Sequence, residues 1–301
     1  MAEVIALLRS TIGPYLRLLR PHQWVKNTFV LVGLLFGHAW RDPELLQQGL
    51  WAFAAFCLLS SAVYVFNDLL DREQDRQHPK KRHRPLASGR IGLPGALVLL
   101  ALCLIGGLTL AFTRAGSAPW VFVAYLVING FYSLGAKHVV VLDVFLISAG
   151  FMLRLLAGTL GLGIAPSHWL LLCGLMLTLF LGFAKRRAEL NAVAGDPSAH
   201  RRVLEDYSET LLDQFITVTL ACTVVSYSLY TLSAETVALH GSNHLILTVP
   251  FVLYGMFRYL FLLHHRGGGG DTATDMFTDP HLILAGAGWL ATVLAVLTGR
   301  L

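Results

Sequence analysis

Long apolar segments, separated by shorter polar ones, dominate this sequence. Of its 301 residues, 55% are hydrophobic and only 14% are charged, and the mean hydropathy is +0.62. Soluble domains carry about 25% charged residues, so this composition is typical of an integral membrane protein. Most segments reach the ~20 residues that a helix needs to cross a bilayer. We therefore predict an all-α membrane protein with nine transmembrane helices, at approximately 27–40, 50–68, 92–113, 118–135, 139–163, 167–184, 211–234, 243–264 and 280–298.

The distribution of Lys and Arg predicts the orientation of these helices. Residues 1–26 read as an amphipathic, basic segment that approaches the bilayer. If the N-terminus is cytoplasmic, nearly all cations fall in cytoplasmic segments, and only Arg41, Arg114 and Arg300 fall outside. Because cytoplasmic loops are enriched in Lys and Arg, we expect an inner (plasma) membrane protein whose C-terminus lies outside. Residues 1–301 are expected to form one domain, with cytoplasmic catalytic loops at 69–91 and 185–210.

Cysteine content and net charge exclude several other classes of protein. The four cysteines lie within apolar segments and lack the spacing of a metal site, so neither a disulfide framework nor a zinc site is expected. A net charge of +5 would suggest nucleic-acid binding in a soluble protein. Membrane orientation explains the cations better here, so no nucleic-acid partner is expected.

The stretch 67–83, NDLLDREQDRQHPKKRH, follows the second apolar segment and predicts a metal site. If the helix continues through residue 75, Asn67, Asp68, Asp71 and Asp75 share one face. Three neighbouring carboxylates repel one another unless cations neutralise them, and hard oxygen ligands suit Mg²⁺. Since Mg²⁺ usually bridges one or two carboxylates to substrate phosphates, we expect a phosphate-bearing substrate. The alternative is a solvated, charged cytoplasmic loop.

Cations follow directly and are candidates for phosphate contacts. Lys81, Arg82 and Arg84 lie just beyond the acidic residues, where a phosphate-bearing substrate would require positive charge. The same cations could instead serve only to orient the neighbouring helices in the membrane.

A second polar segment, KRRAEL, follows the sixth apolar segment. Helical spacing places Lys185, Arg186 and Glu189 on one side of the helix. They could form a simple intrahelical ion pair, or they could clamp a substrate phosphate at the same side of the membrane as the acidic residues. Tyr207 lies in a downstream loop that could cover such a site.

The fifth apolar segment contains two ionisable residues that are costly in a membrane unless paired or hydrated. These are Asp143 and Arg154, and Lys137 lies just before the segment, where it could be an orientation anchor. Asp143 and Arg154 are about 16 Å apart along a helix axis, too far for a direct ion pair. Arg154 therefore needs another partner or a hydrated cavity, and we expect it to face the protein interior.

The string NDLLDREQDRQHPKKRHRPLASG resembles the first signature motif of the UbiA superfamily of intramembrane prenyltransferases. The resemblance covers nearly the whole chain. It implies a helical bundle around a central cavity and a diphosphate bound through Mg²⁺ by Asn67, Asp68, Asp71 and Asp75, with the three aspartates as catalytic residues. By the same resemblance, Lys81, Arg82 and Arg84 are expected to contact phosphate.

One departure from that superfamily points to a particular branch. Ordinary members carry a second aspartate-rich motif where this chain has KRRAEL. Together with RPHQWVKN, AKH and FMLRLLAG, this segment is similar to the decaprenyl-phosphate phosphoribosyltransferase branch. That resemblance implies transfer of 5-phosphoribose from phosphoribosyl diphosphate to a polyprenyl phosphate, with release of pyrophosphate. A site with more cations and fewer carboxylates suits two anionic substrates.

The resemblance extends the expected substrate contacts to other parts of the chain. Lys26 and Asn27 are candidates for holding the acceptor headgroup, and Lys185 and Arg186 for positioning the donor. The alternative is a prenyltransferase that moves an isoprenyl group from its diphosphate to an aromatic or other small acceptor. A transporter of lipid phosphates or metal ions is a third reading. The oligomeric state stays open, a homo-oligomer included.

Overall fold

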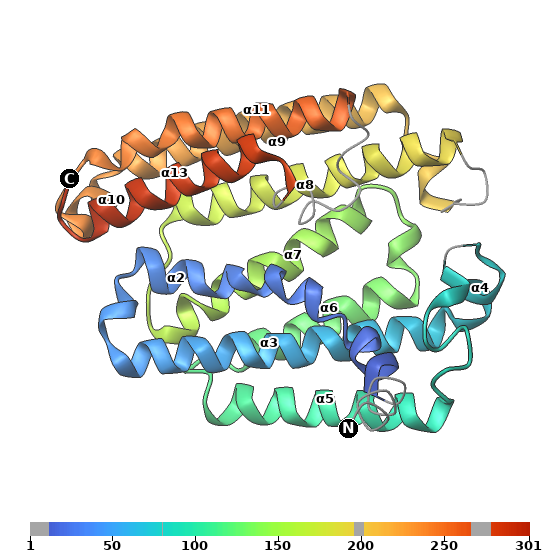
Figure 1. Cartoon of the computed structure of the whole chain (residues 1–301). Helices are drawn as coiled ribbons and strands as arrows, with labels where there is room; N and C mark the ends of the chain where they lie inside the picture. Colours follow the sequence, from blue (N-terminus) through green and yellow to red (C-terminus); the bar gives the residue numbers. More distant parts are fainter. Residues whose placement is uncertain (1–11, 80, 196–201, 266–277) are drawn as a thin grey trace, which may run out of the picture. The chain divides into compact units, whose positions relative to one another are not determined.

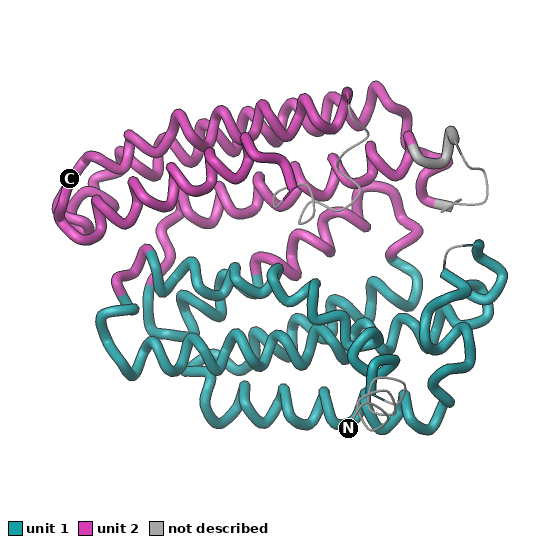
Figure 2. The backbone as a smooth tube through the Cα atoms, viewed as in Figure 1, with its two compact units in different colours: residues 1–35, 39–136, 153–164 teal, residues 36–38, 137–152, 165–301 magenta. Residues whose placement is uncertain are grey.

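The computed structural model describes residues 12–79, 81–195, 202–265 and 278–301, and every regular element among them is a helix. The chain divides into two compact units, which Figure 2 shows in different colours. Unit 1 contains residues 1–35, 39–136 and 153–164, and unit 2 contains residues 36–38, 137–152 and 165–301. Each unit is described separately below.

Unit 1 is built around α3 (Pro43–Leu70), which lies along α5 (Leu93–Thr113) (Figure 1). Asp42 caps α3 by accepting hydrogen bonds from the amides of the second and third helical residues, and proline at the first helical position has no amide to satisfy. The core beside α3 contains Phe56, whose ring centroid is 4.6 Å from that of Phe122 in α6 (Trp120–Leu134). A well-packed apolar core thus holds the middle of α3, and its last turn carries the polar residues.

The first apolar segment does not form the single long helix expected over 27–40. It forms η1 (Pro21–Val30), a 3₁₀ helix, followed by the short α2 (Leu31–Phe36) and η2 (Ala39–Arg41). Pro21 is compatible with the first turn of a helix, but the residue before it is driven away from the right-handed helical region. Arg20 lies outside that region, in a left-handed conformation with a positive φ of 53°, and separates the helical residues 12–19 from η1.

Unit 2 is an antiparallel arrangement of long helices, with α8 (His168–Gly195) against α9 (Glu209–Leu232) and α11 (Val249–His265) against α13 (Pro280–Leu297) (Figure 1). Aromatic pairs join them, since Phe183 of α8 lies 4.9 Å from Phe215 of α9 and Phe180 lies 5.7 Å from Tyr259 of α11. Unit 2 also includes most of α7 (Leu142–Ala157).

Polar residues fix the start of α13. Asp279 caps the helix by accepting from the amides of His281 and Leu282, and it also accepts a 2.7 Å hydrogen bond from Arg258 of α11. The hydrogen bond from Arg258 lowers the pKa of Asp279 to about 2. Among the described residues, the remaining short elements are α4 (Arg72–Gln77), η3 (Lys81–His83), η4 (Ala136–His138), η5 (Leu160–Leu162), η7 (Arg202–Leu204), α10 (Ala234–His240) and η8 (His244–Thr248).

Within the described residues, seven helices are long and apolar enough to cross a membrane. The expectation of an all-α integral membrane protein therefore holds. The α6 helix is apolar but only 15 residues long, and the first apolar segment is broken as described above. The expected count of nine transmembrane helices is thus not confirmed.

Two glycines of unit 1 allow its backbone segments to touch directly. A Cβ on Gly158 would lie 1.7 Å from the carbonyl oxygen of Val30, and a Cβ on Gly33 would lie 1.8 Å from the carbonyl oxygen of Gly158. No side-chain movement can relieve such contacts, because the obstructing atoms belong to the backbone. The end of α7 is therefore packed against the η1–α2 segment without room for a methyl group.

We expect the substitution Gly158→Ala to destabilise the protein by about 1–3 kcal/mol or more, since overpacking forces the backbone apart. Thermal unfolding in detergent, followed by size-exclusion chromatography, measures this. Gly130→Ala is the matched control, because Gly130 in α6 has no atom within 4 Å of its added Cβ. An equal melting temperature for both variants would contradict the packing described here.

Candidate functional site

The acidic residues at the end of α3 come together, although the helix that carries them is interrupted. α3 ends at Leu70 and α4 begins at Arg72, with Asp71 between them at φ −87° and ψ 4°. The expectation of an unbroken helix through residue 75 is therefore wrong, because the helix is interrupted at Asp71. The hydrogen-bond ladder nevertheless continues, because the Asp71 amide donates to the Asn67 carbonyl and the Asp75 amide to the Asp71 carbonyl, at 2.9 and 2.8 Å.

A single arginine joins two of these carboxylates. Arg84 Nη1 lies 3.1 Å from Asp68 Oδ1 and 2.7 Å from Asp75 Oδ2. The Asp68 and Asp75 side chains are only 3% and 5% exposed, so each charge requires compensation in place. Buried Leu86 and Ile91 fold the segment after η3 back onto unit 1 and so bring Arg84 to the acidic residues.

A second arginine reaches the same carboxylate from the N-terminal segment. Arg20 Nη2 lies 2.6 Å from Asp68 Oδ1, and its guanidinium carbon lies 4.9 Å from the centroid of the Tyr64 ring. Both arginines therefore converge on one oxygen atom. We call the four residues Arg20, Asp68, Asp75 and Arg84 the acidic cluster.

Asn67 lies beside the acidic cluster and is held from α6. The hydroxyl of Ser133 donates a short hydrogen bond to Asn67 Oδ1, and it also contacts the carbonyl of Asn129 at 2.7 Å. The amide side chain of Asn67 is thereby oriented by a residue 66 positions away in the sequence.

The donor atoms of the acidic cluster fit a divalent cation that a substrate helps to hold. No group of three or more His, Cys, Asp or Glu residues able to bind a metal is found in the part of the chain that the structure describes. Mg²⁺ does not need such a cage, because one or two carboxylates and substrate phosphates usually suffice. Asp68 and Asp75 already hold a cationic group between them, the Arg84 guanidinium, so the site accepts positive charge at this position.

The other cations expected near the acidic residues differ in exposure. Lys81 and Arg82 are exposed on η3, where the Lys81 amide donates to His78 Nδ1 and Arg82 Nε approaches His83. Lys26 is partly buried in η1. Arg84, in contrast, is partly buried and forms ion pairs with Asp68 and Asp75.

In unit 2, the structure brings together four residues from three separate segments of the sequence. Arg186 Nε lies 2.7 Å from Asp143 Oδ2, and Arg186 Nη1 also lies 2.5 Å from Glu189 Oε2. The Tyr207 hydroxyl donates a 3.0 Å hydrogen bond to Asp143 Oδ1. Asp143 and Arg186 are fully buried, so we call Asp143, Arg186, Glu189 and Tyr207 the buried ion-pair cluster.

Backbone strain occurs directly beside this cluster. Val141 adopts a positive φ of 67°, which is rare for a β-branched residue. Its amide donates a 2.7 Å hydrogen bond to the Tyr207 hydroxyl, which in turn bonds Asp143. Burial, together with the charge of Asp143, raises the pKa of Tyr207 well above its usual value, so the phenol stays protonated as a donor.

The three consecutive cations of KRRAEL have different environments. Arg187 is bound to Glu209 at 2.7 Å and to Asp213 at 3.1 Å, and it also donates to Asn191, so it ties α8 to the start of α9. The Lys185 side chain is partly buried, and no hydrogen bond or ion pair joins it to another described residue. Lys137, on η4, is also partly buried.

Arg154 faces the interior of unit 1, where it is only 6% exposed. Its Nε donates to Asn27 Oδ1 at 2.7 Å, and its Nη2 donates to the Tyr125 hydroxyl at 3.1 Å. The guanidinium also lies 4.7 Å from the centroid of the Tyr125 ring and 5.4 Å from that of Phe56. Asn27 in turn donates to Ser60 Oγ at 3.3 Å. Carbonyl, hydroxyl and aromatic groups thus contribute to stabilising this buried charge.

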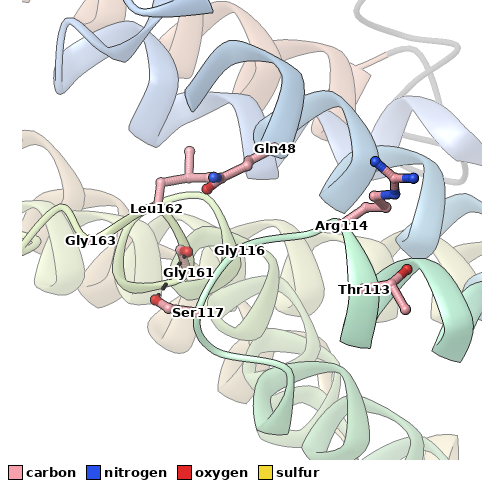
Figure 3. A pocket seen from close by; sticks show the side chains of 8 residues that line it. All are labelled: Gln48, Thr113, Arg114, Gly116, Ser117, Gly161, Leu162 and Gly163. Carbon is pink, nitrogen blue, oxygen red and sulfur yellow. Dashed lines mark hydrogen bonds between the residues drawn. The ribbon is translucent and has the colours of Figure 1, made fainter. Parts of the chain in front are cut away.

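A cavity of about 460 Å³ in unit 1 is separate from the acidic cluster. Figure 3 shows its lining, which comes from α3, the end of α5 and two glycine-containing turns: Gln48, Thr113, Arg114, Gly116, Ser117, Gly161, Leu162 and Gly163. Gln48 precedes Asp68 by twenty residues on α3, which corresponds to about 30 Å along the helix axis. The cavity therefore lies at the opposite end of α3.

Sequence reasoning missed several partners of the candidate residues. Arg20 lies in the basic segment 1–26 and was not among the expected site residues, and neither were Ser133, Tyr125 and Asp213. Arg20 belongs to the string RPHQWVKN, which offered a signal: an arginine directly before a proline, at a helix boundary, beside a basic segment. Ser133 and Tyr125 carry no such local signal, because their partners are far away in the sequence.

The chain is similar to several known proteins over most of its length. The chain is 33% identical to a protein named decaprenyl-phosphate phosphoribosyltransferase from Corynebacterium glutamicum, over 93% of this chain and 86% of that protein. It is 32% identical to a protein of the same name from Mycobacterium tuberculosis, over 94% of each. The structure of a UbiA homolog from Archaeoglobus fulgidus bound to GPP and Mg²⁺ has the same fold, with a TM-score of 0.70 at 20% identity over 95% of this chain and 99% of that one.

The family assignment follows from the extent of these matches. The model of the UbiA prenyltransferase family matches residues 28–279. This range includes the whole buried ion-pair cluster and every residue of the acidic cluster other than Arg20. The chain therefore belongs to the UbiA prenyltransferase family.

Proposed function

We propose that this transferase moves 5-phosphoribose from 5-phosphoribosyl 1-diphosphate to a polyprenyl phosphate of the decaprenyl type, releasing pyrophosphate. The observation that carries the proposal is the acidic cluster, in which two buried carboxylates hold a cationic group between them. Such a site suits a metal-bound diphosphate. The named relatives from C. glutamicum and M. tuberculosis support phosphoribose as the transferred group.

Asp68, Asp71 and Asp75, with the oxygen of Asn67, would hold Mg²⁺ at this site. When bound, the metal would neutralise the negative charge that develops on the departing pyrophosphate. Burial of Asp68 and Asp75 excludes water and strengthens these interactions. The Ser133 hydroxyl keeps the Asn67 oxygen oriented.

The transfer is a displacement at C1 of the ribose. A phosphate oxygen of the lipid forms a bond to C1 while the bond from C1 to the diphosphate oxygen breaks, and the electron pair leaves with pyrophosphate. No general base is required, because the lipid phosphate is already ionised at neutral pH. Direct displacement inverts the configuration at C1, so a product that retains it would exclude this mechanism.

Cations outside the acidic cluster would position the remaining phosphates. Lys81 and Arg82 are exposed on η3, and Lys185 is partly buried on α8. Lys26 and Lys137 are weaker candidates for the acceptor phosphate. The buried contacts of Asn27, Asp143, Arg154, Arg186, Glu189 and Tyr207 favour supporting roles, since each bonds a neighbouring side chain. We further propose that the site faces the cytoplasm, with the C-terminus outside.

The second candidate is a prenyltransferase that uses an isoprenyl diphosphate and a small acceptor. It is favoured by one observation, namely that the neighbouring structure from A. fulgidus was solved with GPP and Mg²⁺. The same acidic cluster would bind the diphosphate of either donor. The two functions therefore differ in the group that is transferred.

Purified protein supplied with Mg²⁺, phosphoribosyl diphosphate labelled in the ribose and decaprenyl phosphate is expected to form a labelled lipid. Chelation of the metal is expected to stop the reaction. Turnover of geranylgeranyl or farnesyl diphosphate with an aromatic acceptor, without any labelled lipid from the ribose donor, would establish the second candidate instead.

Asp75→Asn is expected to lower kcat/KM by about a hundredfold or more, because an amide cannot neutralise a bound metal as a carboxylate does. Glu73→Gln is the matched control on the same helix, since Glu73 is 72% exposed and pairs with the neighbouring Arg72 and Arg76. Steady-state kinetics on both variants measures the effect. Equal activity of Asp75→Asn and wild type would remove the metal-binding role.

Lys185→Gln and Arg186→Gln are expected to act differently. Lys185→Gln should raise the KM for the donor severalfold and leave the melting temperature unchanged, because no described partner is lost. Arg186→Gln should destabilise the protein by about 3–5 kcal/mol, since it leaves the buried Asp143 carboxylate uncompensated. Thermal unfolding and donor KM, measured together, separate the two effects.

The double variant Arg186→Gln, Asp143→Asn provides the check on this interpretation. It removes both charges, so it should recover much of the stability that Arg186→Gln loses. Failure of the double variant to recover any stability would show that the Arg186–Asp143 pair is not the source of the loss.

A further inference from the structure

Arg20 is a cation of the acidic cluster, and the function proposed above gives it no role in the transfer. Arg20 approaches Asp68 from the N-terminal segment, ahead of the residues that match the family description. Its contact of 2.6 Å with Asp68 Oδ1 is shorter than the 3.1 Å contact of Arg84 with the same atom. Asp68 thus has two guanidinium groups on one carboxylate oxygen.

The position of Arg20 is specified by several independent contacts. Leu18 is fully buried among Val65, Leu86 and Ile91, which fixes the end of the preceding helical turn. The hydroxyl of Ser61 donates to the Leu19 carbonyl at 2.8 Å. The same hydroxyl accepts a 3.0 Å hydrogen bond from the Trp24 indole. The backbone on both sides of Arg20 is therefore attached to the face of α3 that leads to Asp68.

Arg20 also occupies an unfavourable backbone conformation. Its φ of 53° and ψ of 57° are left-handed, which costs about 1–2 kcal/mol for a residue with a side chain. The left-handed turn ends the helical residues 12–19 and begins η1, and it leaves the guanidinium over the Tyr64 ring and against Asp68. The surrounding contacts maintain this strain, which is the usual situation of residues placed for function.

Electrostatics suggests what two arginines on one carboxylate accomplish. Without metal, they neutralise carboxylates that burial would otherwise disfavour. A metal ion on Asp68 must compete with them, because both demand the same oxygen. A diphosphate brings several negative charges and can accept the guanidinium groups that Asp68 releases, with bidentate geometry that arginine favours.

We propose that Arg20 is a positioning residue that holds Asp68 in the metal-free protein and transfers its hydrogen bond to the diphosphate when metal and diphosphate are bound together. This inference rests on the proposed function only as far as the diphosphate, which both candidate donors share. Arg20 therefore disfavours metal binding without substrate and favours the metal–diphosphate complex. The acidic cluster assembles with its substrate and is not loaded with metal beforehand.

Two binding measurements on the full-length protein in detergent test the proposal. Mn²⁺ serves as the probe because it prefers the same oxygen ligands as Mg²⁺ and its free form is measured by electron paramagnetic resonance. The first measurement is the Kd for Mn²⁺ alone, and the second is the Kd for inorganic pyrophosphate at saturating Mn²⁺. Neither measurement depends on turnover, and pyrophosphate is the leaving group in both candidate reactions.

Arg20→Gln should shift these two affinities in opposite directions. Mn²⁺ alone should bind about three- to tenfold more tightly, because a competing cation has gone, and pyrophosphate should bind about tenfold more weakly. Arg17→Gln is the matched control, since it removes the same charge from an exposed position in the helical segment just before Arg20 and should change neither affinity. Arg20→Lys, which keeps the charge but lacks the planar fork, should show the same opposite shifts with smaller factors.

A purely structural role of Arg20 would give a different result. Arg20→Gln would then leave both affinities unchanged, or weaken both as the cluster loses its order, and either outcome overturns the proposal. If Arg20→Gln does not fold, Arg20→Lys provides the test. A shift of both of its affinities in the same direction would overturn the proposal. If the wild-type protein binds pyrophosphate with Mn²⁺ but does not transfer phosphoribose, the proposed donor is wrong and the inference on Arg20 is unaffected.

Discussion

Compensation of buried charge is the constraint on which this structure depends. Asp68 lies on the last turn of a helix long enough to cross a membrane, and its carboxylate is almost completely buried. A charge in that position is stable only with close counter-charges, and two arginines from different segments supply them. The placement of the N-terminal segment and the fold of the loop after α4 are both tied to that single requirement.

The same principle is applied differently in three places. At Asp68 the compensating groups come from two partly buried arginines that could turn to another anion. At Asp143 the partner is a fully buried arginine, supported by a tyrosine that a strained valine helps to hold. At Arg154 an amide, a phenol and two aromatic faces contribute to the stabilisation. The first arrangement is exchangeable, whereas the second is suited to permanence, since both members are buried and bonded at short distance.

Local features were predictable from the sequence, and long-range ones were not. Helical class, membrane character and the polar ends of α3 and α8 follow from apolar periodicity and length. The Arg186–Glu189 pair follows from helical spacing, because its members are three residues apart. The Arg186–Asp143 pair joins residues 43 positions apart, and the Arg20–Asp68 pair joins residues 48 apart, so neither could be read from a single sequence. The break of the first apolar segment was also missed, since apolar composition alone does not distinguish a 3₁₀ helix from an α-helix.

The glycine contacts at Gly33 and Gly158 have a consequence for how the family can diverge. Because main chain meets main chain there, the spacing between the first apolar segment and the end of α7 is set without any contribution from side-chain shape. Lipid-facing positions on both segments are then free to exchange one apolar residue for another during evolution. The two glycines are not, so relatives with very different membrane surfaces should still share the absence of a side chain at these two points.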